Sequence, residues 1–212
     1  MVDKENIMKG TTTVGIRCED GVILAADKRV TTGHLIAGQL QKIFEITDNM
    51  AITTAGGVSD NQLLTKLIKA ELKLKEVRTN KKTSVKEAAN LLSQLVYNNI
   101  RKMSMIPGIT HLLLGGSDST GNHLYEVYPD GSLNEYEKFV ASGSGSTMVY
   151  GVLETLYKED MSGDECVDLA LKALSAALKR DSASGDGFVV VKITPEGIER
   201  VADKDLEIKL EK

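Results

Sequence analysis

Blocks of predicted strands alternate with pairs of predicted helices along this chain, and this order is the strongest constraint on its fold. Apolar and β-branched runs predict strands over 12–17, 21–27, 42–46 and 51–55, and helical spacing predicts helices over 60–77 and 85–102. Strands are then predicted at 110–115, 123–128 and 136–141, helices at 147–157 and 164–179, and closing strands at 188–193 and 198–201. A doubly wound parallel sheet would alternate single strands with single helices. The order instead predicts an α+β fold, a four-layer αββα sandwich of two antiparallel sheets flanked by helix pairs.

Local signals support these elements. Asp20-Gly21 is a hairpin signal between the first two strands. Ser84 with Glu87, and Ser162 with Glu165, have capping-box spacing at the starts of two helices. Strands such as 22–26 are apolar without alternation, as expected when both sheet faces are covered. The first four strands are expected to share one sheet.

Composition narrows the class of protein. With 212 residues and 42% hydrophobic content, the chain can bury one substantial core. A net charge of −4 and the absence of Trp make nucleic acid an unexpected partner, and no apolar stretch is long enough to span a bilayer. Cys18 and Cys166 are too few for a disulfide scaffold or a metal site, so a cytoplasmic location is expected. The basic run over 66–82 is interpreted as the solvated face of a helix, with a docking role as the alternative.

The junction between Gly10 and Thr11 offers unusual chemistry. The residues before it contain no apolar run and are interpreted as a short removable leader, 1–10. If the chain is cut after Gly10, Thr11 carries a hydroxyl nucleophile and a free α-amino group, which titrates near pH 8 and can accept the hydroxyl proton. Taken alone, Thr11-Thr12-Thr13 is better explained by ordinary strand propensity, so the catalytic interpretation depends on the rest of the chain.

Other segments supply candidates for the remaining groups of such a site. Asp27 is the last residue of one predicted strand and Lys42 the first of the next, where they form either a site pair or a surface ion pair. Backbone N–H groups around Gly56 follow a strand end and could face an oxyanion, or form a plain turn. The segment 142–146 leads from a predicted strand into a helix, where it could bind a phosphate, but it lacks the lysine and the spacing of a P-loop. The polar segment 180–185 follows a long predicted helix, and its default interpretation is a helix stop.

Together these segments carry a resemblance to a known family. The segments concerned are Gly10-Thr11-Thr12-Thr13-Val14-Gly15, Asp27-Lys28-Arg29, Lys42-Ile43, Thr54-Ala55-Gly56, Gly143-Ser144-Gly145 and Arg180-Asp181-Ser182-Ala183-Ser184-Gly185. In this order they closely resemble the proteasome β subunit family, most nearly its archaeal members. The resemblance extends from Gly10 to about Val201. The resemblance implies an N-terminal-nucleophile (Ntn) hydrolase, with a propeptide at 1–10 that is removed autocatalytically and a single catalytic domain at 11–212.

The resemblance also implies a role for each matching residue. Thr11 is the nucleophile and its freed amine the base, Lys42 lowers the pKa of that amine, and Asp27 keeps Lys42 charged. Gly56 N–H is the oxyanion donor, and three side chains orient the terminal threonine: Ser144, Asp181 and Ser184. The reaction is peptide-bond hydrolysis in unfolded proteins without cofactor or metal. The implied partners are proteasome α subunits, other β subunits in heptameric rings and an AAA ATPase regulator.

Two departures from the family pattern concern Lys42 and the specificity pocket. The segment before Lys42 is one residue shorter than usual, and a typical Lys-Lys pair is reduced to this one lysine. Thr54 stands where the family often has a larger apolar residue, which with Val30 and Val58 predicts a roomier, slightly polar pocket. The alternatives are a non-catalytic structural ring subunit, a bacterial-type two-ring threonine protease subunit, and an Ntn amidase acting on a small molecule. Catalysis by His34, His111 or His123 is not expected, because none has a matching nucleophile pattern.

Overall fold

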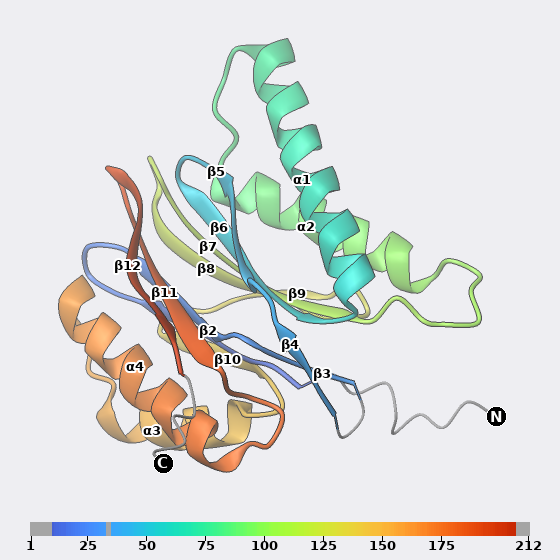
Figure 1. Cartoon of the computed structure of the whole chain (residues 1–212). Helices are drawn as coiled ribbons and strands as arrows, with labels where there is room; N and C mark the ends of the chain where they lie inside the picture. Colours follow the sequence, from blue (N-terminus) through green and yellow to red (C-terminus); the bar gives the residue numbers. More distant parts are fainter. Residues whose placement is uncertain (1–9, 33–34, 207–212) are drawn as a thin grey trace.

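The computed structural model describes residues 10–32 and 35–206, and they form a four-layer sandwich. Two five-stranded antiparallel sheets face each other, with one pair of helices on each outer face (Figure 1). Three apolar clusters fill the layers: one lies between the sheets, and one lies under each helix pair. The predicted αββα architecture is therefore confirmed.

The first sheet holds the amino-terminal strand β1 in its interior, next to an edge strand. Its strand order is β10-β1-β2-β11-β12, so β1 lies between β2 and β10. The bounds are β1 Thr12–Arg17, β2 Val22–Asp27, β10 Phe139–Gly143, β11 Gly187–Thr194 and β12 Gly197–Asp205. Helices α3 (Ser146–Leu156) and α4 (Gly163–Arg180) cover its outer face, where α4 packs Leu169 and Leu174 against β1 and β2.

The second sheet has the order β5-β6-β7-β8-β9. The bounds are β5 Ile43–Thr47, β6 Met50–Gly56, β7 Thr110–Asp118, β8 Gly121–Val127 and β9 Leu133–Glu135. Helices α1 (Val58–Thr79) and α2 (Val85–Ile100) cover its outer face. The long α1 buries Leu64, Ile68 and Leu72 against this sheet, while most of the basic side chains of 66–82 are exposed. The run therefore lies on the exposed side of α1 and of the turn that follows it, as expected.

Three expectations about strands were wrong. The first four predicted strands do not share a sheet: β1 and β2 belong to one sheet, and β5 and β6 to the other. The predicted strand 136–141 begins too early: residues 136–138 are the connection between β9, which ends at Glu135, and β10, which begins at Phe139. The chain crosses from one sheet to the other between them, and local residue patterns do not reveal which strand a strand pairs with.

The third correction is a hairpin that the sequence analysis did not predict. Strands β3 (Arg29–Thr32) and β4 (Leu35–Gln39) form a separate two-stranded sheet after β2. Every residue of β4 is exposed, so this strand has no buried face whose apolar pattern could have revealed it. The hairpin accounts for the distance along the chain between Asp27 and Lys42.

The helix starts agree with the sequence analysis. Both predicted capping boxes form, at Ser84 with Glu87 and at Ser162 with Glu165. Cys18 and Cys166 are free and buried, and contact with the Cys166 thiol together with burial raises the pKa of the Cys18 thiol. In the two ranges that the structure describes, no helix is long and apolar enough to cross a membrane.

Candidate active site

Thr11 lies immediately before β1 and is 5% exposed. Its hydroxyl donates a hydrogen bond to the carbonyl oxygen of Gly10 at 2.7 Å. The Gly10 N–H in turn donates to the hydroxyl of Thr31 on β3 at 3.1 Å. The peptide bond between Gly10 and Thr11 is therefore held in place on both sides, with the Thr11 hydroxyl directed at the carbonyl group before it.

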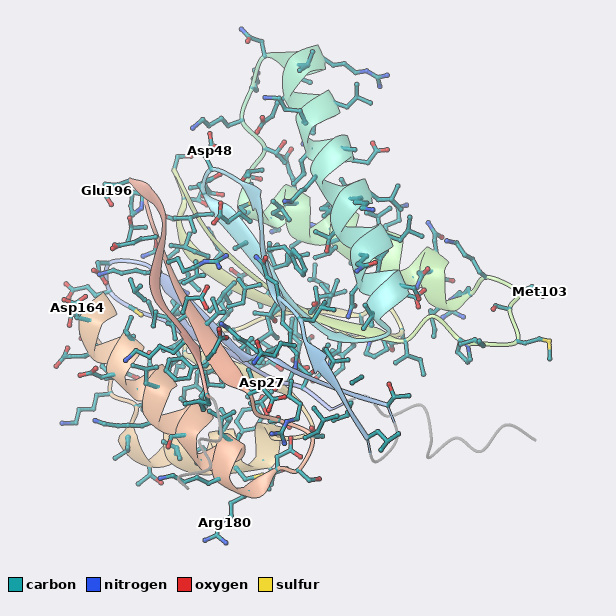
Figure 2. All side chains as sticks on the ribbon, viewed as in Figure 1. Asp27, Asp48, Met103, Asp164, Arg180 and Glu196 are labelled. Atoms are coloured by element: carbon teal, nitrogen blue, oxygen red, sulfur yellow. The ribbon has the colours of Figure 1, made fainter. Side chains whose placement is uncertain are left out.

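Asp27, at the end of β2, collects donors from four segments. Its Oδ1 accepts the Thr12 N–H at 2.9 Å and the Lys42 ammonium at 2.7 Å. Its Oδ2 accepts the N–H groups of Arg29 at 3.1 Å and Gly185 at 3.0 Å. Asp27 thus connects the start of β1 to Lys42, directly before β5, and to the loop after α4. Figure 2 shows it in the interior of the molecule.

Burial opposes both charges of the Asp27 and Lys42 pair. It raises the pKa of the Asp27 carboxyl, against the Lys42 charge and the donated hydrogen bonds, which lower it. It lowers the pKa of the Lys42 ammonium, against the Asp27 carboxylate, which raises it. Loss of either partner would therefore leave a buried charge without compensation.

A chain of hydroxyl groups connects Thr11 to Asp181 at the end of α4. The Thr11 N–H donates to Ser144 Oγ at 3.3 Å, and Ser144 Oγ donates to Asp181 Oδ2 at 2.6 Å. Ser184 Oγ donates to the same carboxylate oxygen at 2.6 Å and lies 2.7 Å from the Thr12 hydroxyl. The Asp181 carboxylate therefore orients two serines that contact the chain on both sides of the Thr11 carbonyl.

Gly56 ends β6 and lines one cavity with Thr11 and Lys42. Its φ is +103°, a conformation open mainly to glycine, and the Ile109 carbonyl leaves no room for a side chain there. The cavity has a volume of about 30 Å³. Its further lining residues are Gly10, Arg29, Val30, Leu40, Phe44, Thr54, Val58, Asn61 and Gln62.

The structure brings all of the sequence-predicted site residues together. Thr11, Asp27, Lys42, Ser144, Asp181 and Ser184 form one hydrogen-bonded network, and Gly56 and the predicted pocket residues Val30, Thr54 and Val58 line the adjoining cavity. Sequence reasoning missed Leu40, Phe44, Asn61 and Gln62 in the cavity, and Thr31 beside Gly10. Leu40 and Asn61 reach the cavity because β3, β4 and the first turn of α1 border it, and no local motif signals this.

The described histidines lie in other clusters. His111 Nε2 is 2.7 Å from the buried Glu126 carboxylate, and His123 Nδ1 is 2.9 Å from Glu135. His34 lies outside the described residues. Among residues 10–32 and 35–206, no three His, Cys, Asp or Glu side chains gather in a way that could hold a metal ion.

Comparison with known proteins gives one consistent result. A family model for proteasome subunits matches residues 7–193. The chain is 47% identical to the proteasome subunit beta of Ferroglobus placidus over 209 residues, which cover 98% of each chain. It is 45% identical to that of Archaeoglobus fulgidus over 205 residues, covering 96% of this chain and 94% of the relative. It is 43% identical to that of Methanospirillum hungatei over 98% of each chain.

Proposed function

The chain belongs to the proteasome subunit family and is a β subunit of the core proteasome, and we propose that it acts as a threonine endopeptidase with Thr11 as its nucleophile. The observation that carries this proposal is the contact of 2.7 Å between the Thr11 hydroxyl and the Gly10 carbonyl oxygen. The contact lies within a buried network that contains a lysine, two carboxylates and two serines.

Maturation is the first reaction of the proposed site. Thr11 Oγ attacks the Gly10 carbonyl carbon, the Gly10–Thr11 amide bond breaks, and an ester bond from Gly10 to Thr11 Oγ replaces it. Water then hydrolyses this ester, which releases residues 1–10 and leaves Thr11 with a free amine and a free hydroxyl. In the uncut chain Thr11 N belongs to an amide and cannot act as a base, so the leader keeps the peptidase inactive.

In the mature chain the same groups hydrolyse substrate peptides. The freed amine accepts the Thr11 hydroxyl proton, and the positive charge of Lys42, held by Asp27, lowers the pKa of that amine. The hydroxyl oxygen attacks the substrate carbonyl carbon while Gly56 N–H stabilises the oxyanion. The peptide C–N bond then breaks, the leaving amine takes the proton held by the Thr11 amine, and the substrate acyl group remains as an ester on Thr11 Oγ. Water hydrolyses this ester, with the Thr11 amine again as the base, and restores the free hydroxyl. Asp181, through Ser144 and Ser184, orients the terminal threonine.

The complete network favours this function over the alternatives. A non-catalytic ring subunit has no need for a buried Lys42 ammonium on Asp27, a pair whose burial disfavours both charges. The full-length likeness to archaeal β subunits disfavours a bacterial-type two-ring protease subunit and a small-molecule amidase.

As a proteasome subunit, the chain assembles with other subunits in rings. We propose heptameric β rings stacked on rings of proteasome α subunits, fed by an AAA ATPase that unfolds cytoplasmic proteins. Enclosure in such a chamber would protect folded proteins from an unselective peptidase.

Degradation of an unfolded protein tests the proposal. The chain is assembled with its α subunit and mixed with a permanently denatured protein, and fragments are measured over time. We expect the wild type to produce short peptides and a Thr11→Ala complex, shown to contain the same rings, to produce none. Equal fragment production by both complexes would refute Thr11 as the nucleophile.

A further inference from the structure

We propose that Asn99 and Asp60 are positioning residues that hold the oxyanion turn, defined here as Gly56–Gly57, in its working geometry. The proposal rests on the proposed function, because it concerns the donor that would face the developing oxyanion. Neither residue touches the substrate peptide. Both act by fixing the backbone of the oxyanion turn.

The oxyanion turn is held directly by the residues that lead into β7. The Gly57 N–H donates to the Ile109 carbonyl at 2.9 Å, and Gly56 pairs with Thr110 as the last register position between β6 and β7. The turn has a positive φ at Gly56 and lies just before the first residue of α1. The position of Gly56 N–H therefore depends on where residues 108–110 lie.

The loop before Ile109 has few apolar anchors of its own. Met103 is fully exposed, and Met105 and Ile106 are 92% and 73% exposed. Figure 2 shows Met103 at the outer end of a loop that projects away from the sheets. Within one chain, packing by these side chains therefore does not fix the carboxyl end of the loop.

Asn99 supplies the missing anchor. It lies in the last turn of α2, is 5% exposed, and its Nδ2 donates to the Gly108 carbonyl at 3.1 Å and to Asp60 Oδ1 at 2.9 Å. A Cβ at Gly108 would collide with Asn99 Nδ2 and Asp60 Oδ1 unless these side chains moved, so both lie close to this glycine. One amide group thus connects α2 to the loop and to the first turn of α1.

Asp60 links this anchor to α1. It occupies the first turn of α1, three residues after Gly57, and its second carboxylate oxygen, Oδ2, fills the space that a side chain at Gly57 would need. The hydrogen bonds run from Gly57 to Ile109, from Asn99 to Gly108 and from Asn99 to Asp60. The oxyanion turn is thereby fixed to both helices of the outer layer, and not only to its neighbouring strand.

This geometry predicts a specific catalytic defect. Oxyanion donors act at about 2.7–3.1 Å, so a shift of the turn weakens transition-state stabilisation and leaves substrate binding in the apolar part of the cavity unchanged. Removing a donor outright costs about 10²–10³ in kcat, and a displaced donor is expected to cost about tenfold.

The test compares Asn99→Asp with Asn98→Asp, a matched control on the exposed side of the same turn. Both are made in chains that begin at Thr11, so that maturation does not limit the measurement, and are assembled with the α subunit. Two inhibitors with the same peptide portion are used: a peptide aldehyde, whose adduct with Thr11 places an oxyanion in the site, and a peptide vinyl sulfone, which alkylates Thr11 without forming one there.

We expect Asn99→Asp to lose about tenfold in kcat and in aldehyde affinity, with KM and the vinyl sulfone labelling rate within about twofold of wild type. Asn98→Asp should match wild type throughout. Unchanged aldehyde affinity in Asn99→Asp, or an equal loss of vinyl sulfone labelling, would overturn the proposal. Failure of the wild type itself to be labelled at Thr11 would instead refute the proposed function.

A double variant tests the route through Gly108. Asp60→Asn combined with Asn99→Asp restores an amide–carboxylate pair between the helices but leaves the Gly108 carbonyl facing a carboxylate, so kcat should stay low. Recovery of wild-type kcat would overturn this route. If Asn99→Asp does not assemble, Asn99→Ala carries the same expectation, and failure of both to assemble would make Asn99 a folding residue and refute the positioning role.

Discussion

The Asp27 carboxylate and the Lys42 ammonium meet at 2.7 Å, with side chains that are 0% and 6% exposed. The pair joins the end of β2 to the residue before β5, two strands that belong to different sheets. Because Asp27 also accepts the Thr12 N–H, a single carboxylate oxygen links the position of Lys42 to the residue that follows Thr11, the proposed nucleophile.

Lys42→Ala should inactivate the enzyme and destabilise the fold. It leaves the Asp27 carboxylate buried without a counter-charge, which costs about 3–5 kcal/mol of unfolding free energy. Denaturant unfolding of the unassembled chain measures the loss, and Lys81→Ala, at an exposed position, is the control. A Lys42→Ala chain that unfolds at the wild-type midpoint would contradict this account of the pair.

Ser144→Ala should slow peptide hydrolysis by about 10- to 100-fold in kcat with little change in KM. The variant removes the hydroxyl between Thr11 N and Asp181, so the amine loses its orienting partner while the substrate cavity is unaltered. Steady-state kinetics of the assembled complex measure both constants. Ser182→Ala, in the loop after α4, serves as the control, and a purely KM-based defect in Ser144→Ala would disagree with the orienting role.

Glu126→Gln should remove a pH-dependent part of the stability. Burial raises the pKa of the Glu126 carboxyl, but hydrogen bonds from His111 and Tyr136 outweigh burial, and its net pKa is lowered. A carboxyl whose pKa is lower in the folded state than in the unfolded state stabilises the fold at pH values above its ordinary pKa of about 4.3. This contribution is lost as the pH falls through the pKa of the folded state.

The difference in unfolding free energy between wild type and Glu126→Gln should therefore be largest near neutral pH and shrink below about pH 4. Denaturant unfolding at a series of pH values measures it. The exposed Glu71→Gln is the control, and a difference that stays constant from neutral to acid pH would show that Glu126 is not the titrating group.

Thr54→Met should change the preferred substrate. Thr54 is buried and lines the cavity that Thr11 also lines. The longer apolar side chain of methionine would occupy this cavity, whose volume is about 30 Å³. We expect kcat/KM for peptides with a bulky residue before the cleaved bond to fall about tenfold relative to peptides with alanine there. A peptide panel measures the ratio, with Thr155→Met on α3 as the control. An unchanged ratio would show that Thr54 does not determine the specificity of the pocket.

The sequence predicted the layer order well, because strands and helices each leave a local signal. Hydrophobic spacing and the capping boxes at Ser84 and Ser162 located the helices to within a few residues. Which strands pair is not a local property, and so β1, β2, β5 and β6 were wrongly grouped. The β3–β4 hairpin was missed because its exposed residues show no buried face.

Some site residues could likewise be predicted from local sequence, and others could not. Thr11, Asp27 and Asp181 lie in motifs of a few residues, and the resemblance to a family assigned roles that spacing alone left open. Asn61 and Asn99 belong to helices whose pattern does not distinguish them from other polar positions. Only the fold reveals that Asn99 reaches Gly108 across the loop that joins α2 to β7.

The most direct measurement is the intact mass of the chain after assembly with its α subunit, beside a Thr11→Ala variant treated identically. The account predicts that the wild type loses residues 1–10 and that the variant keeps them. Retention of the leader by wild-type chains in complete rings, or its loss from Thr11→Ala at the same bond, would contradict self-cleavage by the Thr11 hydroxyl.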